Sequence, residues 1–209
     1  EDLLNYNEDV EYIKVEDVDD ELNRVASIFY DDPSSKLTVF GVTGTNGKTT
    51  VTSLIQDILN TSVNTGYIGT INIAYNNKTI AAQYTTPEVI ELQKVMSNMV
   101  DENVKALAIE VSSHALIQKR VCALKVDYPI FTNLTHEHLD YHGTMEEYFN
   151  AKAQLFKELT EQQCAVINVD DEYGRKLIDS EIPNYVTYGI DNDADYHAVD
   201  AEYSFDKTT

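Results

Sequence analysis

The stretch GVTGTNGKTT at residues 41–50 has the composition of a phosphate-binding loop. Glycines let backbone N–H groups converge on an anion, and a helix that begins near Lys48 would point its positive end at the same place. The Lys48 ammonium could reach the outer phosphates of a nucleotide, and the Thr49 hydroxyl could hold Mg²⁺. The usual pattern G-x-x-x-x-G-K-[ST] has a glycine where this chain has Val42, so the match is a variant. The alternative is an ordinary glycine-rich turn between a strand and a helix.

The segments on either side of the loop favour the first interpretation. Residues 37–40 form a β-branched and aromatic run, which is typical of a buried strand. After the loop, apolar residues recur at helical spacing, at Val51, Leu54, Ile55 and Ile58. The sequence therefore predicts a strand, a glycine loop containing Gly41, Gly44 and Gly47, and a helix.

A carboxylate follows the most apolar run of the chain. Residues 106–109 are typical of a central parallel strand, and the run ends in Glu110. A carboxylate at the end of a central strand, beside a phosphate loop, is well placed to bind Mg²⁺. The alternative is a strand-end side chain that caps a helix or faces water.

Three histidines lie close together in HEHLDYH, residues 136–142. Their spacing is not the H-E-x-x-H of zinc proteases. The imidazole of His138, on a loop after a strand, could bind a metal ion. For each of the three, a simple hydrogen-bonding role is the more ordinary interpretation.

One lysine lies on the apolar face of a predicted helix. Thr144 and Glu147 form a capping box that opens this helix. Its apolar positions are Met145, Tyr148, Phe149, Leu155 and Phe156. Lys152 falls on the same face, so it either extends its ammonium to solvent or has a chemical task. Burial would lower its pKa and leave a neutral amine able to react with CO₂, and the resulting carbamate would be an anionic ligand for Mg²⁺.

Two further polar segments could bind an anionic substrate. In the segment 85–87, Thr86 as N-cap and Pro87 at the first helical position predict a helix over 87–99. The same hydroxyls and N–H groups could bind an anionic group. Beyond the Glu110 strand, Arg120 could clamp a carboxylate or phosphate, or it could be an exposed helix charge.

Strand and helix patterns alternate from Leu37 onward, which predicts an α/β fold with a doubly wound, mostly parallel sheet and a ligand at the C-terminal ends of its strands. The further strands expected are 106–111, 128–132 and 164–169. Residues 66–73 and 78–83 flank Asn76-Asn77 and predict a hairpin. Near the N-terminus, Asp19 or Asp20 could cap a helix whose apolar face contains Leu22, Val25, Ala26 and Phe29.

Composition limits the class of protein. The chain has 209 residues and a net charge of −21, which argues against nonspecific binding to nucleic acid or membranes. An anion site must therefore be local. Cys122 and Cys164 form no CxxC pair and are most simply buried thiols in a reducing cytosol. With no signal peptide or membrane-length apolar run visible, we expect a cytoplasmic protein.

Four segments together resemble the Mur ligases, the ATP-dependent amide-forming enzymes of peptidoglycan synthesis. They are GVTGTNGKTT, YTTPE, EVSSHALIQKRV and FTNLTHEHLDYHGTMEEYFNAKAQLF, in family order and over most of residues 37–160. The loop G-x-x-G-T-N-G-K-T is the family's own variant, which accounts for Val42. The resemblance is strongest to the MurE branch, which adds the third residue of the stem peptide.

The resemblance implies roles residue by residue. The ATP phosphates would be bound by Gly44, Thr45, Asn46, Gly47, Lys48, Thr49 and Thr50. The ligands of Mg²⁺ would be Thr49, Glu110, His138 and a carbamate on Lys152. The catalytic group would comprise Lys48, Lys152, Glu110 and His138. The substrate would be held by Thr85, Thr86, Ser112, Gln118 and Arg120. One departure is Tyr84, where an Asn often precedes the two threonines.

The implied reaction has two steps. ATP would phosphorylate the D-Glu carboxylate of UDP-MurNAc-L-Ala-D-Glu, and the amine of L-lysine or meso-diaminopimelate would then displace phosphate. The resemblance places residues 1–36 in the tail of a UDP-binding N-terminal domain and residues 37–209 in an incomplete central P-loop ATPase domain, without the C-terminal domain. We therefore expect a monomeric fragment that cannot catalyse alone. The alternatives are a related amide ligase of the folylpolyglutamate or cyanophycin synthetase type, and a non-catalytic nucleotide-binding domain.

Overall fold

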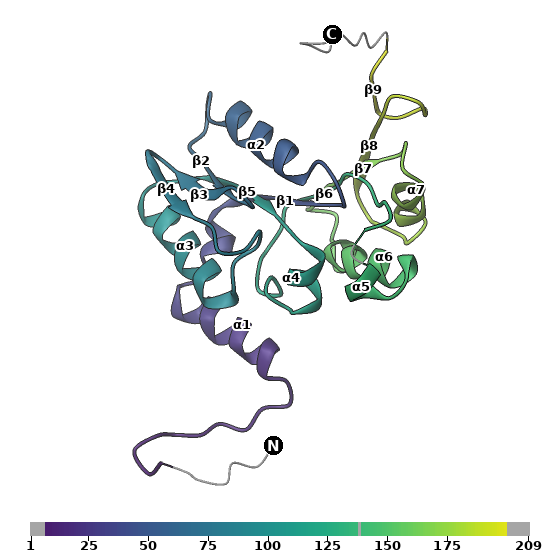
Figure 1. Ribbon diagram of the computed structural model, residues 1–209. Coiled ribbons are helices and arrows are strands. Elements are labelled where there is room, and N and C mark those ends of the chain that lie inside the picture. The colour runs from purple at the N-terminus through teal and green to yellow at the C-terminus, as the bar shows by residue number, and fades with distance from the viewer. Residues whose placement is uncertain (1–6, 138, 200–209) are drawn as a thin grey trace.

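Nine strands form one sheet in residues 7–137 and 139–199, the part of the chain that the computed structural model describes (Figure 1). The strand order is β4-β3-β2-β5-β1-β6-β7-β8-β9. The β2–β3 and β3–β4 pairs are antiparallel, and every other pair is parallel. The strands are β1 Thr38–Thr43, β2 Thr65–Ile68, β3 Asn72–Tyr75, β4 Lys78–Ala81, β5 Ala106–Glu110, β6 Tyr128–Phe131, β7 Ala165–Asn168, β8 Tyr185–Gly189 and β9 Tyr196–His197. The predicted mostly parallel sheet is confirmed.

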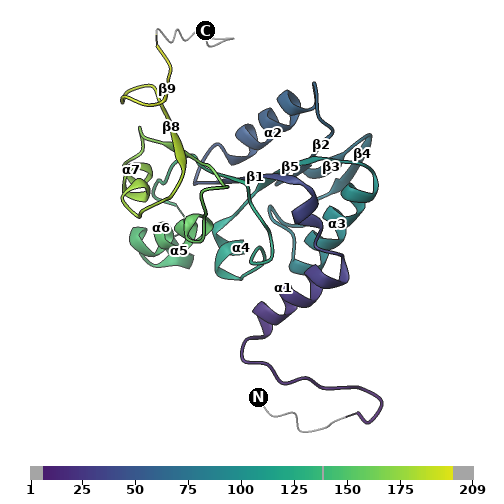
Figure 2. The same ribbon diagram turned by 180° about the vertical axis from the view of Figure 1, so that it is seen from behind.

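Helices cover both faces of the sheet, as a doubly wound fold requires. Helix α2 lies on one face, and α3, α4 and α6 lie on the other (Figures 1 and 2). The helices are α1 Val18–Phe29, α2 Lys48–Leu59, α3 Val89–Asp101, α4 Ser113–Ile117, α5 Leu139–His142, α6 Met145–Ala153 and α7 Glu172–Ile178, with short 3₁₀ turns η1 Pro33–Lys36 and η2 Gln154–Phe156. The crossover from β1 to β2 runs one way along the sheet, and the later crossovers run the other way. Because such crossovers are right-handed, the two directions place their helices on opposite faces. In the described ranges, no helix is both long and apolar enough to span a membrane.

The central parallel strands β1, β2, β5 and β6 are buried along most of their length, and this fixes the edge that carries the candidate site. Every residue of β5 is buried, and Leu107 and Ile109 are fully enclosed. In the parallel register Val42 pairs with Glu110, so β5 ends directly beside the loop that follows β1. The expected meeting of the phosphate loop and Glu110 therefore follows from strand register.

The predicted hairpin is partly correct. Asn76 and Asn77 join β3 to β4, and Asn76 has a φ of 51°, which asparagine tolerates in tight turns. The run 66–73, however, is not one strand. It divides at residues 69–71 into β2, which pairs with β5, and β3, which begins the hairpin. Apolar residues continue across the turn, at Ile71 and Ile73, so the apolar pattern gives no sign that β2 and β3 are separate strands.

Helix α1 differs from the prediction in its cap and in its buried face. Its N-cap is Asp17, which accepts hydrogen bonds from the backbone N–H groups of Asp19 and Asp20. The buried side chains are Asn23 and Ala26. Apolar side chains expected to pack inward are exposed instead, namely Leu22, Val25 and Phe29. Asn23 lies on the buried face of α1 because its side chain donates to the backbone oxygen of Lys119 and accepts from the N–H of Ala123.

Helix α2 exposes two of the apolar residues whose spacing predicts it, and the cysteines differ from the prediction. Leu54 and Ile58 are exposed, and Thr52 is the buried residue of this helix. The helix itself begins at Lys48 as predicted. Cys122 is exposed and Cys164 is partly buried, so neither is a buried thiol.

We expect Asn23→Ala to lower the free energy of unfolding by about 1 to 3 kcal/mol, because it leaves buried backbone groups without partners. Urea unfolding measures this change. Asn98→Ala, on the exposed side of α3, is the matched control and should change the value by less than about 0.5 kcal/mol. Equal effects of the two substitutions would contradict a role for Asn23 in docking α1.

Candidate active site

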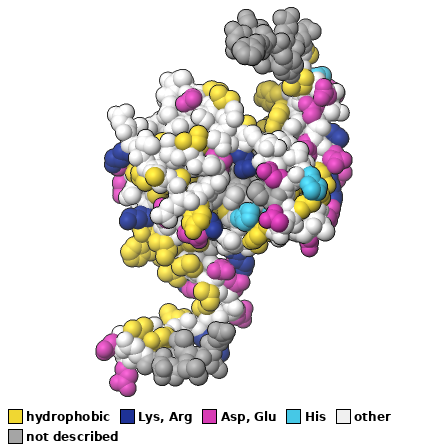
Figure 3. Space-filling model, in the orientation of Figure 1, with side chains coloured by type: hydrophobic (Ala, Val, Ile, Leu, Met, Phe, Trp, Pro, Cys, Tyr) yellow, Lys and Arg dark blue, Asp and Glu magenta, His cyan; other side chains and the backbone are white. Residues whose placement is uncertain are grey.

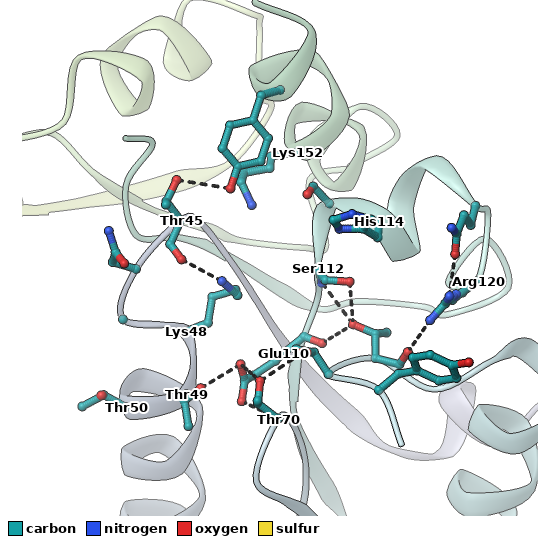
Figure 4. Close-up of a pocket in the computed structure, with 18 residues that line it drawn as sticks. Thr45, Lys48, Thr49, Thr50, Thr70, Glu110, Ser112, His114, Arg120 and Lys152 are labelled. Atoms are coloured by element: carbon teal, nitrogen blue, oxygen red, sulfur yellow. Dashed lines mark hydrogen bonds between the residues drawn. The ribbon is translucent and has the colours of Figure 1, made fainter. Parts of the chain in front are cut away.

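A cavity of about 550 Å³ lies at the C-terminal edge of the sheet and gathers most of the predicted site residues (Figure 4). The predicted residues in its lining are Thr45, Asn46, Gly47, Lys48, Thr49, Thr50, Thr85, Thr86, Glu110, Ser112, Gln118, Arg120 and Lys152. Gly44 lies next to the cavity and bonds two of the lining lysines through its carbonyl. His138 lies outside the described residues, so its prediction stays open.

The loop between β1 and α2 needs glycine at two positions. Gly44 has a φ of +149°, and a Cβ there would lie 1.9 Å from Thr132 Oγ1. Thr132 uses that oxygen to donate to the backbone oxygen of Asn46, 2.8 Å away. Gly47, the N-cap of α2, has a φ of +82°, which favours glycine. Gly41, expected in the loop, lies instead inside β1.

Asn133 holds the outer side of the loop, a role that no motif in the sequence indicates. Its backbone oxygen accepts from the N–H of Thr45 at 2.8 Å, and its Oδ1 accepts from the N–H of Asn46 at 2.9 Å. The first N–H groups of α2 have no acceptors within the helix. The loop is therefore braced from outside, while the helix N-terminus is available to an anion.

Two lysines converge on one carbonyl. Lys48 Nζ donates to the oxygens of Gly44 and Thr45, at 3.0 and 2.8 Å. Lys152 Nζ donates to the same Gly44 oxygen at 2.7 Å. Burial lowers the pKa of Lys48. Burial, with the nearby Lys48 charge, holds the pKa of Lys152 well below the ordinary lysine value.

The Lys152 side chain is only 1% exposed, so it does not extend its ammonium to solvent. Its Nζ lies 4.6 Å from the ring centroid of Tyr148. The capping box of Thr144 and Glu147 that opens this helix is confirmed. Of the two interpretations offered by the sequence, extension of the ammonium to solvent is wrong, and a chemical task for Lys152 stays a prediction.

The Glu110 carboxylate is fully buried and accepts four hydrogen bonds. Its Oε1 accepts from the Tyr67 hydroxyl and from the backbone N–H of Thr70, both at 2.9 Å. Its Oε2 accepts from the hydroxyl of Thr49 at 2.9 Å and that of Thr70 at 3.1 Å. The alternative that Glu110 faces water is wrong.

Tyr67 and Thr70 are site residues that no motif in the sequence indicates. Both lie within the run 66–73, whose pattern predicts a single strand. Gly69 was the one local signal of a turn in that run, and its place became informative only once the register of β2 with β5 was known.

Thr86 has a different role from the helix cap expected of it. Helix α3 begins at Val89, with Glu88 as its N-cap. The Thr86 hydroxyl donates to the backbone oxygen of Glu110 at 2.8 Å and accepts from the N–H of Ser112 at 3.0 Å. It therefore fastens the YTTPE segment to the end of β5, where Ser112 caps α4.

Arg120 is held in place on the rim of the cavity. Its side chain is 11% exposed, so it is not a free surface charge. It donates to the backbone oxygen of Thr86 at 3.1 Å and pairs with the Glu88 carboxylate at 2.8 Å. The ring of Tyr84 lies 4.7 Å below the guanidinium, a cation–π geometry. Tyr84, which stands where an Asn is common in the family, thus contacts Arg120, a predicted substrate-binding residue.

The described histidines of HEHLDYH divide between surface and core. His136 is exposed. His142 is buried, its Nε2 lies 2.9 Å from Ser113 Oγ, and its ring stacks on Tyr148. Among residues 7–137 and 139–199, no group of three or more His, Cys, Asp or Glu side chains is arranged to hold a metal ion.

Comparison with known proteins identifies the family. Residues 42–209 match the family described as the Mur ligase middle domain. The chain belongs to the Mur ligase family. It is 42% identical over 204 residues to a UDP-N-acetylmuramoyl-L-alanyl-D-glutamate--2,6-diaminopimelate ligase of Geobacter sulfurreducens, covering 94% of this chain and 40% of that protein. A ligase of the same name from Alkaliphilus oremlandii is 47% identical over 193 residues, covering 90% and 39%.

Solved Mur ligases share the fold. A structure of a UDP-N-acetylmuramoyl-L-alanyl-D-glutamate--2,6-diaminopimelate ligase superposes with a TM-score of 0.79 at 29% identity, over 90% of this chain and 40% of that one. A MurF ligase from Thermotoga maritima in complex with ADP has a TM-score of 0.63 at 20% identity, over 94% and 42%. The chain therefore spans about 40% of the length of the Mur ligases it matches.

We expect Lys152→Met to leave the free energy of unfolding unchanged or to raise it by about 1 to 4 kcal/mol, because the variant removes a buried cationic group. The lowered pKa means that protonated Lys152 opposes folding. The advantage of Met should be full below the folded-state pKa and fade as pH rises toward the ordinary lysine value.

Urea unfolding across a pH series measures this advantage. Exposed Lys157→Met is the matched control and should show no such pH dependence. A clear loss of stability in Lys152→Met at every pH would mean that Lys152 is a structural residue.

Proposed function

We propose that this chain is the ATP-binding core of a MurE-type ligase. The whole enzyme would join meso-diaminopimelate to UDP-MurNAc-L-Ala-D-Glu through an acyl phosphate, in the cytoplasmic steps of peptidoglycan synthesis. The observation that carries this proposal is the buried Glu110 carboxylate bonded to Thr49 at the start of α2, in one cavity with Lys48 and Lys152. The names of the relatives support the substrate and the amine.

The loop residues 44–50 fit the phosphates of a nucleoside triphosphate. The α2 N-terminus would receive the phosphates, and Lys48 would move from its two carbonyl partners to the outer phosphate oxygens. The catalytic contribution of these residues is to orient the phosphates and neutralise their charge.

The donor set also fits Mg²⁺, which prefers oxygen ligands. Glu110 Oε2 and Thr49 Oγ1 lie 2.9 Å apart and would both bind the ion. When bound, Mg²⁺ would neutralise charge on the phosphates. The lowered pKa of Lys152 supports its role as a carbamate-bearing ligand, because only the neutral amine reacts with CO₂. The assignment of His138 as a further ligand rests on the family resemblance.

The peptide substrate would occupy the opposite rim. Its proposed partners are Thr85, Thr86, Ser112, Gln118 and Arg120. Arg120 is already oriented by Glu88 and Tyr84, which reduces the entropy lost when it binds a carboxylate. We further propose that residues 1–36 are the tail of the N-terminal domain and that residues 37–209 belong to the central domain, acting as a monomer.

A folylpolyglutamate synthase of Mycobacterium tuberculosis also shares the fold, with a TM-score of 0.70 at 13% identity. That likeness concerns the fold alone. The YTTPE and EVSSHAL segments favour the MurE reaction over folylpolyglutamate or cyanophycin synthesis. The other candidate is a protein that binds nucleotide without turnover. ATP titration and substrate-dependent phosphate release together distinguish it from a MurE-type ligase.

Calorimetric titration of the chain with ATP should show binding that is stronger with Mg²⁺ than with a chelator. Lys48→Ala should abolish the binding, because the phosphates lose the cation nearest the loop. Lys94→Ala, an exposed lysine on α3, is the matched control for charge and should bind normally. ATP binding by Lys48→Ala at the unmutated affinity would refute the phosphate-loop assignment.

In a full-length protein containing this chain, Lys152→Ala should abolish phosphate release that depends on UDP-MurNAc-dipeptide and diaminopimelate, because a proposed Mg²⁺ ligand is lost. The Lys157→Ala variant should retain turnover, since that side chain is exposed and outside the cavity. ATP binding without any turnover of these substrates by the unmutated enzyme would favour a non-catalytic nucleotide-binding protein.

A further inference from the structure

The two oxygens of the Glu110 carboxylate face different kinds of donor. Oε1 accepts from the Tyr67 hydroxyl and from the Thr70 backbone N–H, each at 2.9 Å. Among the described residues, the donors to Oε2 are the rotatable hydroxyls of Thr49 and Thr70. A backbone N–H cannot turn away, whereas a threonine hydroxyl can rotate and offer a lone pair to a cation. Oε1 is therefore committed to the protein, and Oε2 can accept an ion.

Tyr67 is built into the sheet at the position that this contact requires. It lies on β2 opposite Ala108 of β5, two residues before Glu110 on the same face of the sheet. Its side chain is only 3% exposed. Burial and the Glu110 contact raise the pKa of the Tyr67 hydroxyl, so it stays protonated as a donor.

The turn after β2 leaves no room beside this hydrogen bond. A Cβ on Gly69 would lie 2.3 Å from Glu110 Oε1 and 2.3 Å from the Tyr67 hydroxyl. The φ of Gly69 is not in the left-handed region, so it is space, and not backbone conformation, that requires glycine here. Any side chain at position 69 would push the Tyr67 hydroxyl and the Glu110 carboxylate apart.

We propose that Tyr67 is a positioning residue that holds Oε1 of Glu110 so that Oε2 alone is presented to the Mg²⁺ of bound nucleotide. The proposal rests on the proposed function of this cavity as a Mg²⁺–ATP site. Tyr67 does not touch the nucleotide or the ion in this arrangement, and it acts through Glu110. Outer-shell hydrogen bonds of this kind orient metal ligands, and their loss commonly weakens metal binding about 10- to 100-fold.

The test is calorimetric titration of the chain with ATP, with Mg²⁺ and with a chelator in its place. Tyr67→Phe keeps the buried ring and removes the hydroxyl. We expect it to weaken Mg²⁺–ATP binding about tenfold or more and to leave metal-free ATP binding unchanged. Tyr75→Phe, which removes the hydroxyl of a buried tyrosine on β3 outside the cavity, is the matched control and should change neither affinity.

A double-mutant cycle shows whether Tyr67 acts through Glu110. In a Glu110→Gln background, Tyr67→Phe should cause no further loss of Mg²⁺ dependence. Gly69→Ala places a methyl group against the same hydrogen bond and should reproduce the selective loss. If thermal unfolding shows that Tyr67→Phe does not fold, Gly69→Ala decides the question by the same criteria.

Unchanged Mg²⁺–ATP affinity in Tyr67→Phe would overturn the proposal. Equal losses with and without Mg²⁺, or an undiminished loss in the Glu110→Gln background, would do the same, since each indicates a role that is only structural. Failure of the unmutated chain to bind Mg²⁺–ATP would instead refute the proposed function, and this inference with it.

Discussion

The burial of the Glu110 carboxylate is the constraint on which the arrangement of the cavity depends. A carboxylate removed from water is costly unless its oxygens receive hydrogen bonds. The four donors come from the start of α2, from β2 and from the turn that follows β2. The donors precede Glu110 by 40 to 61 residues, and the order β2-β5-β1 brings them to its carboxylate. The same sheet order that forms the core therefore also satisfies this charge.

The opposite wall of the cavity has the converse problem, because two lysine side chains lie close together, Lys152 buried and Lys48 half-buried. Lys48 and Lys152 share the carbonyl of Gly44, and the charge of Lys48 further lowers the pKa of Lys152. An anion between them would relieve their repulsion. Until an anion binds, the backbone carbonyls of Gly44 and Thr45 hold the two amines in place, so this wall of the cavity is ordered.

Local sequence patterns predicted the elements whose formation depends mainly on residues nearby in the chain. The strand, loop and helix around residues 41–50, the capping box at Thr144 and the buried end of β5 all follow from short-range periodicity and cap chemistry. They also placed Lys152 on a buried face. The family resemblance, and not the periodicity, supplied the substrate-binding assignment of residues such as Gln118.

The site residues that the sequence does not indicate depend on contacts between segments far apart in the chain. Tyr67 and Thr70 donate to Glu110, and Asn133 accepts from the N–H of Asn46. No spacing rule in the sequence identifies those partners. Asn23 displaced apolar residues from the buried face of α1 because it met two backbone groups of the α4–β6 connection. In each case a specific hydrogen bond outweighed the average behaviour of the residue type.

The contrast between the acidic exterior and the lysines inside the cavity has a kinetic consequence. The chain carries a net charge of −21, and acidic side chains crowd the side of the molecule that carries α5, α6 and α7 (Figure 3). A polyanion must cross this repulsive field before it meets the lysines. Salt screens the long-range repulsion far more than it screens the buried contacts. Association with an anionic ligand should therefore become faster as ionic strength rises, the reverse of electrostatic steering.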